Sequence, residues 1–395
     1  MKQISTLLFS LFLVPSAIGQ VADGFYRVKN VTSDRYLYVT DNEGYARLEG
    51  TDLVHDLDAV VLRKGLEHAI TDPSSIIFVK RSGSTNIYDL FCQGTSVKEM
   101  AGGHSIMVDP KSGYYTVGTK EKGFSAYLGD ATTNSYQYGR IDTKASEKYN
   151  LWNPISVDAK SDNYFAVQPE IEANGSYYAS FYASFGFQPS SADMQVFCIS
   201  KVDEKNGLVC LSELSGIIPN STPVIISSNS NQVSDNRLDL IYSASKLTEK
   251  NKLSGNYFNY DNQFLADGFI PEARPGYEKY YKYSVKHHNS QTKYDPSTMR
   301  LLGLSPEGKL AFIKLSAADC PYLPANQAYL KVSSNAPDCF LVLSESEYNA
   351  STSIDSIVLD DDSELTFDLL GKRVDKSTKL PAGIYIIGGK KTIIR

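Results

Sequence analysis

The chain has 395 residues, which is too long for one ordinary hydrophobic core and predicts two domains with additional terminal segments. Its hydrophobic content of 42% is typical of globular domains and indicates neither a disordered nor a membrane-embedded chain. The formal net charge of -6, without clusters of basic residues, argues against nucleic acid and anionic membrane surfaces as partners. Abundant tyrosine (27 residues) favours short strands joined by tight turns.

Residues 1–19 have the three parts of a signal peptide. Lys2 gives a positively charged start, residues 4–14 form an apolar run, and small residues up to Gly19 occupy the spacing of a cleavage site before Gln20. The run is too short to span a bilayer permanently, and no cysteine follows it for lipid attachment. The sequence therefore predicts an exported protein with no transmembrane segment in its mature chain.

Residues 20–158 are predicted to form short strands in three units of about 40–45 residues, hence one closed β domain with pseudo-threefold symmetry. Gly24-Phe-Tyr-Arg-Val28 and Tyr36-Leu-Tyr-Val39 alternate apolar and polar residues around a turn, and comparable pieces recur at 76–94 and 114–154. The first pattern resembles the opening of a β-trefoil repeat in ricin-like domains. A helical insertion is expected at residues 52–69 from its apolar spacing.

The resemblance to ricin-like domains implies a sugar site in which an aromatic ring stacks on the sugar and an Asp near the turn binds its hydroxyls. The Gln-x-Trp signature of that family is missing, because Trp152 stands in Leu-Trp-Asn instead. Tyr36, Tyr38 and Asp41 could form a remnant site in the first unit. The alternative is that they are core and turn residues of a trefoil used as a scaffold.

Residues 159–345 are predicted to form a second, antiparallel β domain, a two-sheet sandwich or a related packing. Two modules, at 194–226 and 299–330, share the order strand, turn, strand, Ile/Leu-Pro-(x)-Asn turn, strand. Each proline stands at a strand entrance, where its missing backbone donor costs least. The string Leu323–Leu330 resembles an uncharacterised β domain of exported Bacteroidetes proteins, and that resemblance implies no enzymatic activity.

Residues 257–294, between the two modules, are polar and rich in tyrosine, which predicts a long loop or an irregular hairpin. Long loops on rigid scaffolds are frequent binding sites. Tyrosine offers a large, rigid, amphipathic contact face at low entropic cost. The candidate ligand contacts are therefore Tyr277, Tyr280, Tyr281 and Tyr283.

The five cysteines are an odd number for an exported protein. Cys198 and Cys210 lie on two predicted strands with the same parity, so a cross-strand disulfide is possible there, and Cys320 could bridge to Cys339 in the same way. Cys92 is then left over. Buried free thiols that act as small hydrophobic residues are the open alternative for all five.

Residues 346–364 are predicted to be an acidic linker, and residues 365–395 a short β-hairpin cassette. Ser356, in Asp355-Ser-Ile357, matches the short O-glycosylation pattern of Bacteroidetes proteins. The strings Phe367–Val374 and Gly383–Lys391 resemble the C-terminal cassette that is tied to type IX secretion in that phylum. This resemblance implies a Bacteroidetes origin, the export machinery as a partner, and a cell-surface, outer-membrane-vesicle or extracellular location.

No catalytic or metal-binding motif is recognisable. The five histidines have no metal spacing, no nucleophile elbow or phosphate-binding loop is present, and Glu170 and Glu172 share only a strand parity. The sequence thus predicts an all-β protein without cofactor or catalysis, which binds or adheres at the cell surface and could recognise a glycan or a host surface protein. The alternatives are a structural or assembly protein of the surface, and a hydrolase of unrecognised type.

Overall fold

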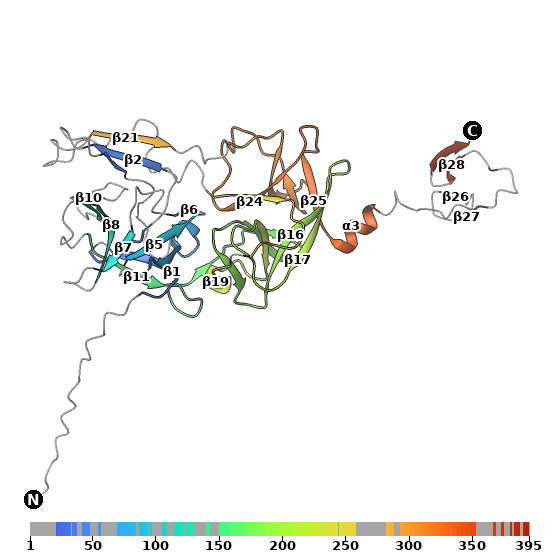
Figure 1. Ribbon diagram of the computed structural model, residues 1–395. Helices are drawn as coiled ribbons and strands as arrows, with labels where there is room; N and C mark the ends of the chain where they lie inside the picture. Colours follow the sequence, from blue (N-terminus) through green and yellow to red (C-terminus); the bar gives the residue numbers. More distant parts are fainter. Residues whose placement is uncertain are drawn as a thin grey trace, which may run out of the picture.

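The computed structural model describes residues 21–32, 34–37, 42–47, 54–56, 69–83, 87–93, 95–96, 105–108, 114–121, 124–129, 140–142, 150–243, 245–257, 282–287, 293–352, 366–368, 373–374, 380, 383–387 and 390–394. Strands dominate this part of the chain, and the all-β prediction is confirmed. Figure 1 shows two adjoining bodies of β structure and a small sheet at the C-terminal end that stands apart from them.

The first sheet closes on itself to form a ring. In order around it, the ring strands are β1 (Gly24–Asn30), β4 (Ile77–Arg81), β5 (Ile87–Cys92), β7 (Ser105–Val108), β8 (Tyr115–Glu121) and β11 (Trp152–Ser156). Each is antiparallel to the next, and β11 returns to β1. Shorter strands lie between them in the chain: β2 (Asn42–Arg47), β3 (Val54–Asp56), β6 (Thr95–Ser96), β9 (Phe124–Gly129) and β10 (Arg140–Asp142). Shorter strands separate β1 from β4, β5 from β7 and β8 from β11 in the chain. This threefold repetition agrees with the closed three-unit domain predicted above.

Strand register decides which side chains face into the ring. Val28, Val79, Leu90 and Trp152 are buried, and the pairs Val79–Leu90 and Asn30–Trp152 put them on one face of the sheet. The residues between them necessarily point to the other face, because side chains alternate along a strand. On β4 and β5 the residues that face outward include Phe78 and Phe91, which are paired across the two strands.

The body next to the ring contains a ten-stranded sheet and a three-stranded sheet, and we call it the second unit. It carries both predicted modules. Its ten-stranded sheet has the order β13 (Ile171–Ala173), β14 (Ser176–Phe181), β18 (Val224–Ser228), β16 (Met194–Asp203), β17 (Leu208–Leu214), β25 (Cys339–Ser344), β23 (Leu310–Ile313), β22 (Met299–Leu304), β24 (Gln327–Lys331), β20 (Leu253–Asn256). The orders β18-β16-β17 and β24-β22-β23 are equivalent, so the modules are structurally alike. β25 joins them, parallel to β17 and antiparallel to β23.

The shared proline turns of the two modules also match in backbone conformation. Ser221 and Asn326, each two residues after the turn proline, have positive φ angles of 57° and 54°. The left-handed region is unfavourable for residues with a Cβ, so its use at both positions marks a common turn. The structural partner of Asn326 is therefore Ser221 rather than Asn220, which the sequence pattern had aligned with it.

A hydrophobic core connects the ring to the second unit. The three-stranded sheet β12 (Phe165–Ala166), β19 (Arg237–Ile241), β15 (Gly186–Pro189) contributes Phe165 and Phe187 to a buried cluster that also contains Ile76 from the entrance of β4. Arg27 is fully buried beside it and donates hydrogen bonds to Asn163 Oδ1 and the Tyr164 carbonyl, both at 2.8 Å. These contacts fix the second unit against the ring.

Three local predictions are wrong in part. Residues 54–56, placed in a helical insertion at 52–69, form β3, and its neighbours at 57–68 lie outside the described residues. Residues 282–287, in the segment predicted as a long loop or an irregular hairpin, form β21 (Lys282–His287), which pairs with β2 as Figure 1 shows. Alternating polar and larger side chains in this segment suit an added strand better than a loop.

The third correction concerns the start of the predicted linker, where α3 (Glu345–Thr352) is helical. Ser344 Oγ accepts the Glu347 N–H at 3.3 Å, while Glu347 Oε2 accepts the Ser344 N–H at 2.9 Å. This reciprocal pair is a capping box, whose Ser-x-x-Glu pattern is present in the sequence. The rest of the linker, including Ser356, lies outside the described residues.

The C-terminal cassette is a four-stranded sheet with the order β27 (Arg373–Val374), β26 (Thr366–Asp368), β28 (Gly383–Ile387), β29 (Lys390–Ile394). Its last two strands form an antiparallel pair from Ile387–Lys390 to Gly383–Ile394. Tyr385 and Thr366 are buried within it. The short sheet thus has a small core of its own.

Candidate binding cleft

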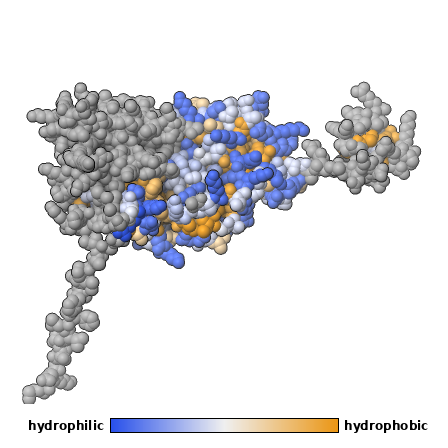
Figure 2. Space-filling model, viewed as in Figure 1, coloured by the Kyte–Doolittle hydropathy of each residue, from blue (hydrophilic) through white to orange (hydrophobic). Residues whose placement is uncertain are grey.

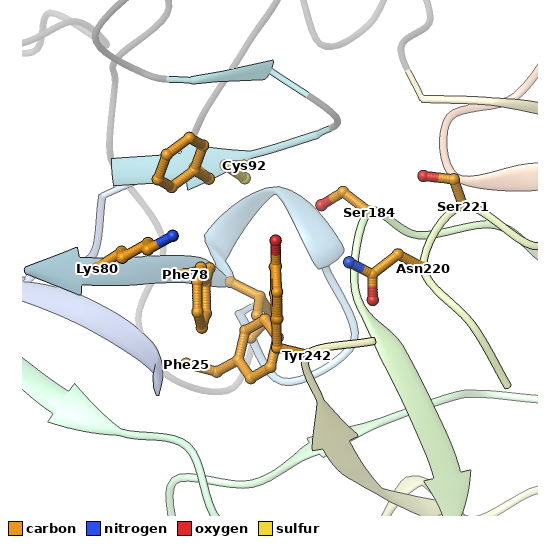
Figure 3. Close-up of a pocket in the computed structure, with 10 residues that line it drawn as sticks. Phe25, Phe78, Lys80, Cys92, Ser184, Asn220, Ser221 and Tyr242 are labelled. Atoms are coloured by element: carbon orange, nitrogen blue, oxygen red, sulfur yellow. The ribbon is translucent and has the colours of Figure 1, made fainter. Parts of the chain in front are cut away.

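A cleft lies where the ring meets the second unit. Its cavity volume is about 380 Å³, and Figure 3 shows strands of the ring on one side and loops of the second unit on the other. The lining residues come from both bodies: Phe25, Ile76, Phe78, Lys80, Phe91 and Cys92 from the ring side, and Ser184, Asn220, Ser221 and Tyr242 from the second unit. Neither body by itself contains this site.

One wall of the cleft is aromatic. Phe25, Phe78 and Phe91 share the outer face of the ring because β1 pairs Phe25 with Phe78 and β5 pairs Phe91 with Phe78. Tyr242 from the second unit stacks on Phe78, with ring centroids 4.5 Å apart and planes 11° from parallel. Phe91 and Tyr242 remain 37% and 56% exposed, and apolar colour shows on the described surface near the junction in Figure 2. The wall therefore offers accessible aromatic side chains next to the cavity.

The opposite wall is polar. Ser184 Oγ accepts the backbone N–H of Gln93 at 3.0 Å, and Asn220 Oδ1 accepts the N–H of Ser243 at 3.1 Å. Both side chains keep a donor group for a ligand, namely the Ser184 hydroxyl proton and the Asn220 amide nitrogen. The cleft is thus amphipathic, with rings on one side and hydrogen-bond donors on the other.

Two ionisable groups near the cleft are held neutral. Burial, and then Asp72, raise the pKa of the Cys92 thiol well above its usual range. Burial also raises the pKa of Tyr257, whose hydroxyl lies 2.7 Å from Ser221 Oγ. A thiol with a raised pKa is a poor nucleophile at neutral pH. The Cys92 thiol is therefore not activated as a nucleophile.

A buried amide pair keeps the two sides of the cleft in place. Gln93 Nε2 donates to Asn326 Oδ1 at 3.0 Å, and Asn326 Nδ2 donates to Gln93 Oε1 at 2.9 Å. The two side chains belong to the ring and to the second unit, and both residues have positive φ. Since Gln93 also contacts Ser184, the cleft is preformed by the docking of the two bodies.

Of the sequence-predicted contact residues, the structure describes Tyr36 and the backbone of Tyr283. Tyr36 is only 5% exposed, and Lys29 Nζ lies 5.9 Å from the centroid of its aromatic ring. This burial favours the scaffold alternative for Tyr36. Tyr283 lies in β21, opposite Ala46 of β2. The other predicted contacts, Tyr38, Asp41, Tyr277, Tyr280 and Tyr281, lie outside the described residues.

The disulfides considered from the sequence are not formed, and all five cysteines are free thiols. Cys198 is paired across the hairpin with Ser212, while Cys210 is paired with Lys201. The register that follows from the pairing of Asp203 with Leu208 beside the turn sets the two cysteines apart along the ladder, which a parity count alone could not foresee. Cys320 and Cys339 are likewise unbridged.

Glu170 and Glu172 line a second, larger hollow of about 740 Å³ between the β13 region and the β22–β23 turn. This hollow is shallow and open to solvent, and both carboxylates are exposed. Catalysis by a pair of carboxylic groups requires that they flank a bound substrate at a defined separation.

Within the described part of the chain, no group of three or more His, Cys, Asp or Glu side chains is arranged to hold a metal ion. None of the helices described there is long and apolar enough to cross a bilayer. No protein-family model, no curated protein and no solved structure matches the chain.

Sequence reasoning did not find the cleft, although part of its signal was present. The strings Ile76-Ile-Phe-Val79 and Tyr88-Asp-Leu-Phe91 put a phenylalanine at the position that alternates away from the apolar core face. A large aromatic residue on the solvent face of a strand indicates a contact surface. No local pattern points to Tyr242, which reaches the site only through the docking of the second unit.

Proposed function

We propose that the protein is a non-catalytic binding protein, exported or attached to the cell surface, and that its ligand site is the cleft between the ring and the second unit. The observation that carries this proposal is the amphipathic cavity, in which half-buried Phe78 and exposed Tyr242 stack opposite the donors of Ser184 and Asn220. The signal-peptide pattern and the resemblance of the C-terminal cassette support export.

A saccharide is the ligand class that best fits these walls. A pyranose ring has an apolar face of C–H groups that packs on aromatic rings, while its hydroxyls require hydrogen-bond partners at the edge. The cavity of about 380 Å³ lies within the size range of small-ligand sites, which is roughly 300–1,000 Å³. The resemblance to ricin-like domains points to the same ligand class, although at a different place on the fold.

The proposal is tested by screening the full-length chain on a glycan array and titrating the best glycan into single variants. We expect Tyr242→Ala and Phe91→Ala each to weaken binding about tenfold or more, because each removes ring surface from the wall. Leu304→Ala is the matched control, since Leu304 is 40% exposed, about as much as Phe91, but lines the other hollow.

Two results would contradict the proposal. Glycan binding that Tyr242→Ala and Phe91→Ala leave unchanged would place the site elsewhere. A chain that binds no glycan, but captures a protein partner or assembles with itself, would favour the adhesion or structural alternatives.

A further inference from the structure

We propose that the cleft selects saccharides that carry a carboxylate, and that Lys80 is the residue that recognises this charge. This inference rests on the proposed function, because it names the class of saccharide that the same cleft would take. It is carried by the position of Lys80, by the donors that share the cleft with it, and by the lack of acidic groups among the described residues of the lining.

Lys80 is the one charged side chain among the described residues that line the cleft. It stands on the outer face of β4, two residues after Phe78, and is exposed. Figure 3 shows its ammonium group directed toward the cavity beside the ring of Phe78. Within the described part of the chain it makes no ion pair, although Asp89 lies opposite it on β5. The ammonium group is thus available to a ligand.

The other polar groups of the lining are suited to the same saccharide. Asn220 uses its Oδ1 for the Ser243 N–H, so its amide nitrogen is the end that remains for the cavity, and Figure 3 shows that nitrogen on the side of Ser184. The hydroxyl of Ser184 already accepts from Gln93 and can donate outward. An ionised carboxylate accepts hydrogen bonds only, so the Lys80 ammonium group complements it, while the donors across the cavity suit hydroxyl oxygens of the same saccharide.

The charge distribution favours one carboxylate over a polyanion. The chain carries a formal net charge of -6, and Asp89 is close to Lys80. A densely charged polymer would meet repulsion over the surrounding surface, within a Debye length of about 8 Å at physiological salt. A terminal acidic sugar places its single charge at Lys80 while the rest of the ligand stays neutral.

The test compares a trisaccharide that ends in glucuronic acid with the same trisaccharide whose carboxyl group is a methyl ester. Both are titrated calorimetrically into the full-length chain. We expect the acid to bind at least about fivefold more tightly than the ester, the advantage of a solvent-accessible charge-assisted hydrogen bond. Lys80→Gln should remove this difference between the acid and the ester.

Asp89→Asn provides a second, independent readout on the opposite strand. Removal of its negative charge should widen the preference for the acid, and raised salt should narrow the preference in the wild-type chain. Neither change should affect the ester, because the ester carries no charge.

The outcomes separate this inference from the proposed function. Equal affinity for acid and ester, with both lost in Tyr242→Ala, overturns the role of Lys80 and leaves the cleft as a binding site. A preference for the acid that Lys80→Gln does not change also overturns it. If neither trisaccharide binds, the proposed saccharide site and the inference fail together.

Discussion

The amide pair between Gln93 and Asn326 can be tested by replacing Gln93 with Glu, which changes one NH₂ group to oxygen and preserves the shape. Gln93 is 2% and Asn326 7% exposed, so water cannot substitute for a lost partner. A protonated Glu can still make both hydrogen bonds, with its O–H donating to Asn326 Oδ1 and its carbonyl accepting from Nδ2. An ionised Glu can accept from Nδ2 but has nothing to donate to Oδ1.

The magnitude follows from the lost interactions. The ionised form loses one hydrogen bond of about 1 kcal/mol and leaves the buried Asn326 oxygen unsatisfied at about 1–3 kcal/mol, so its total cost is about 2–4 kcal/mol. Since one pKa unit corresponds to about 1.4 kcal/mol, the folded-state pKa of the introduced Glu should rise from about 4.3 to about 6–7. Because the folded-state pKa is raised, the variant keeps its stability below about pH 4, the unfolded-state pKa of Glu. It loses stability as the pH rises through the folded-state pKa of about 6–7.

The assay is urea unfolding of Gln93→Glu and the wild-type chain at matched pH values, followed by the fluorescence of Trp152. Trp152 is the single tryptophan and is buried in the ring, so it reports the unfolding of the body that carries Gln93. We expect the variant to be destabilised by less than about 1 kcal/mol near pH 4 and by about 2–4 kcal/mol near pH 8.

Gln93→Leu is the matched control for this prediction. The leucine side chain would lack both hydrogen bonds at every pH and, being unbranched at Cβ like Glu, places the same demand on the backbone at φ 51°. The destabilisation caused by Gln93→Leu should therefore not depend on pH. If the difference between Gln93→Glu and wild type is the same at pH 4 and pH 8, the two side chains do not pair as described.

Two further predictions concern other buried groups. Arg27→Met should destabilise the chain by about 3–5 kcal/mol in urea unfolding, because the acceptors Asn163 Oδ1 and the Tyr164 carbonyl lose a charged donor in a dry interface, whereas exposed Lys160→Met should have little effect. Burial and Glu249 raise the pKa of Cys198 to about 11, so iodoacetamide should label Cys198 in the folded chain on the order of a hundredfold more slowly at pH 8 than in urea. Rapid labelling of folded chain, located at Cys198 by mass spectrometry, would show that this thiol is not buried.

The sequence predicted the features that depend on neighbouring residues. Alternation of apolar side chains indicated the strands of β1 and β4, and the repeated proline turns indicated two similar modules in the second unit. The capping box at Ser344 is an equally local signal for the start of a helix. The acidic composition that follows it favours a linker instead, so composition and capping pattern give opposite predictions there. Parity alone does not fix the register of a hairpin, so it gave the wrong partners for Cys198 and Cys210.

The sequence by itself determined that this is an all-β chain with a closed first sheet and a duplicated second one, because periodicity and turn chemistry act over a few residues. Only the tertiary structure decided where a ligand could bind. Phe25, Phe78, Phe91 and Tyr242 are far apart in the chain, and the pairing of β1, β4 and β5 brings the first three onto one face. Tyr242 joins them through docking contacts such as the amide pair of Gln93 with Asn326, and no local pattern encodes that contact.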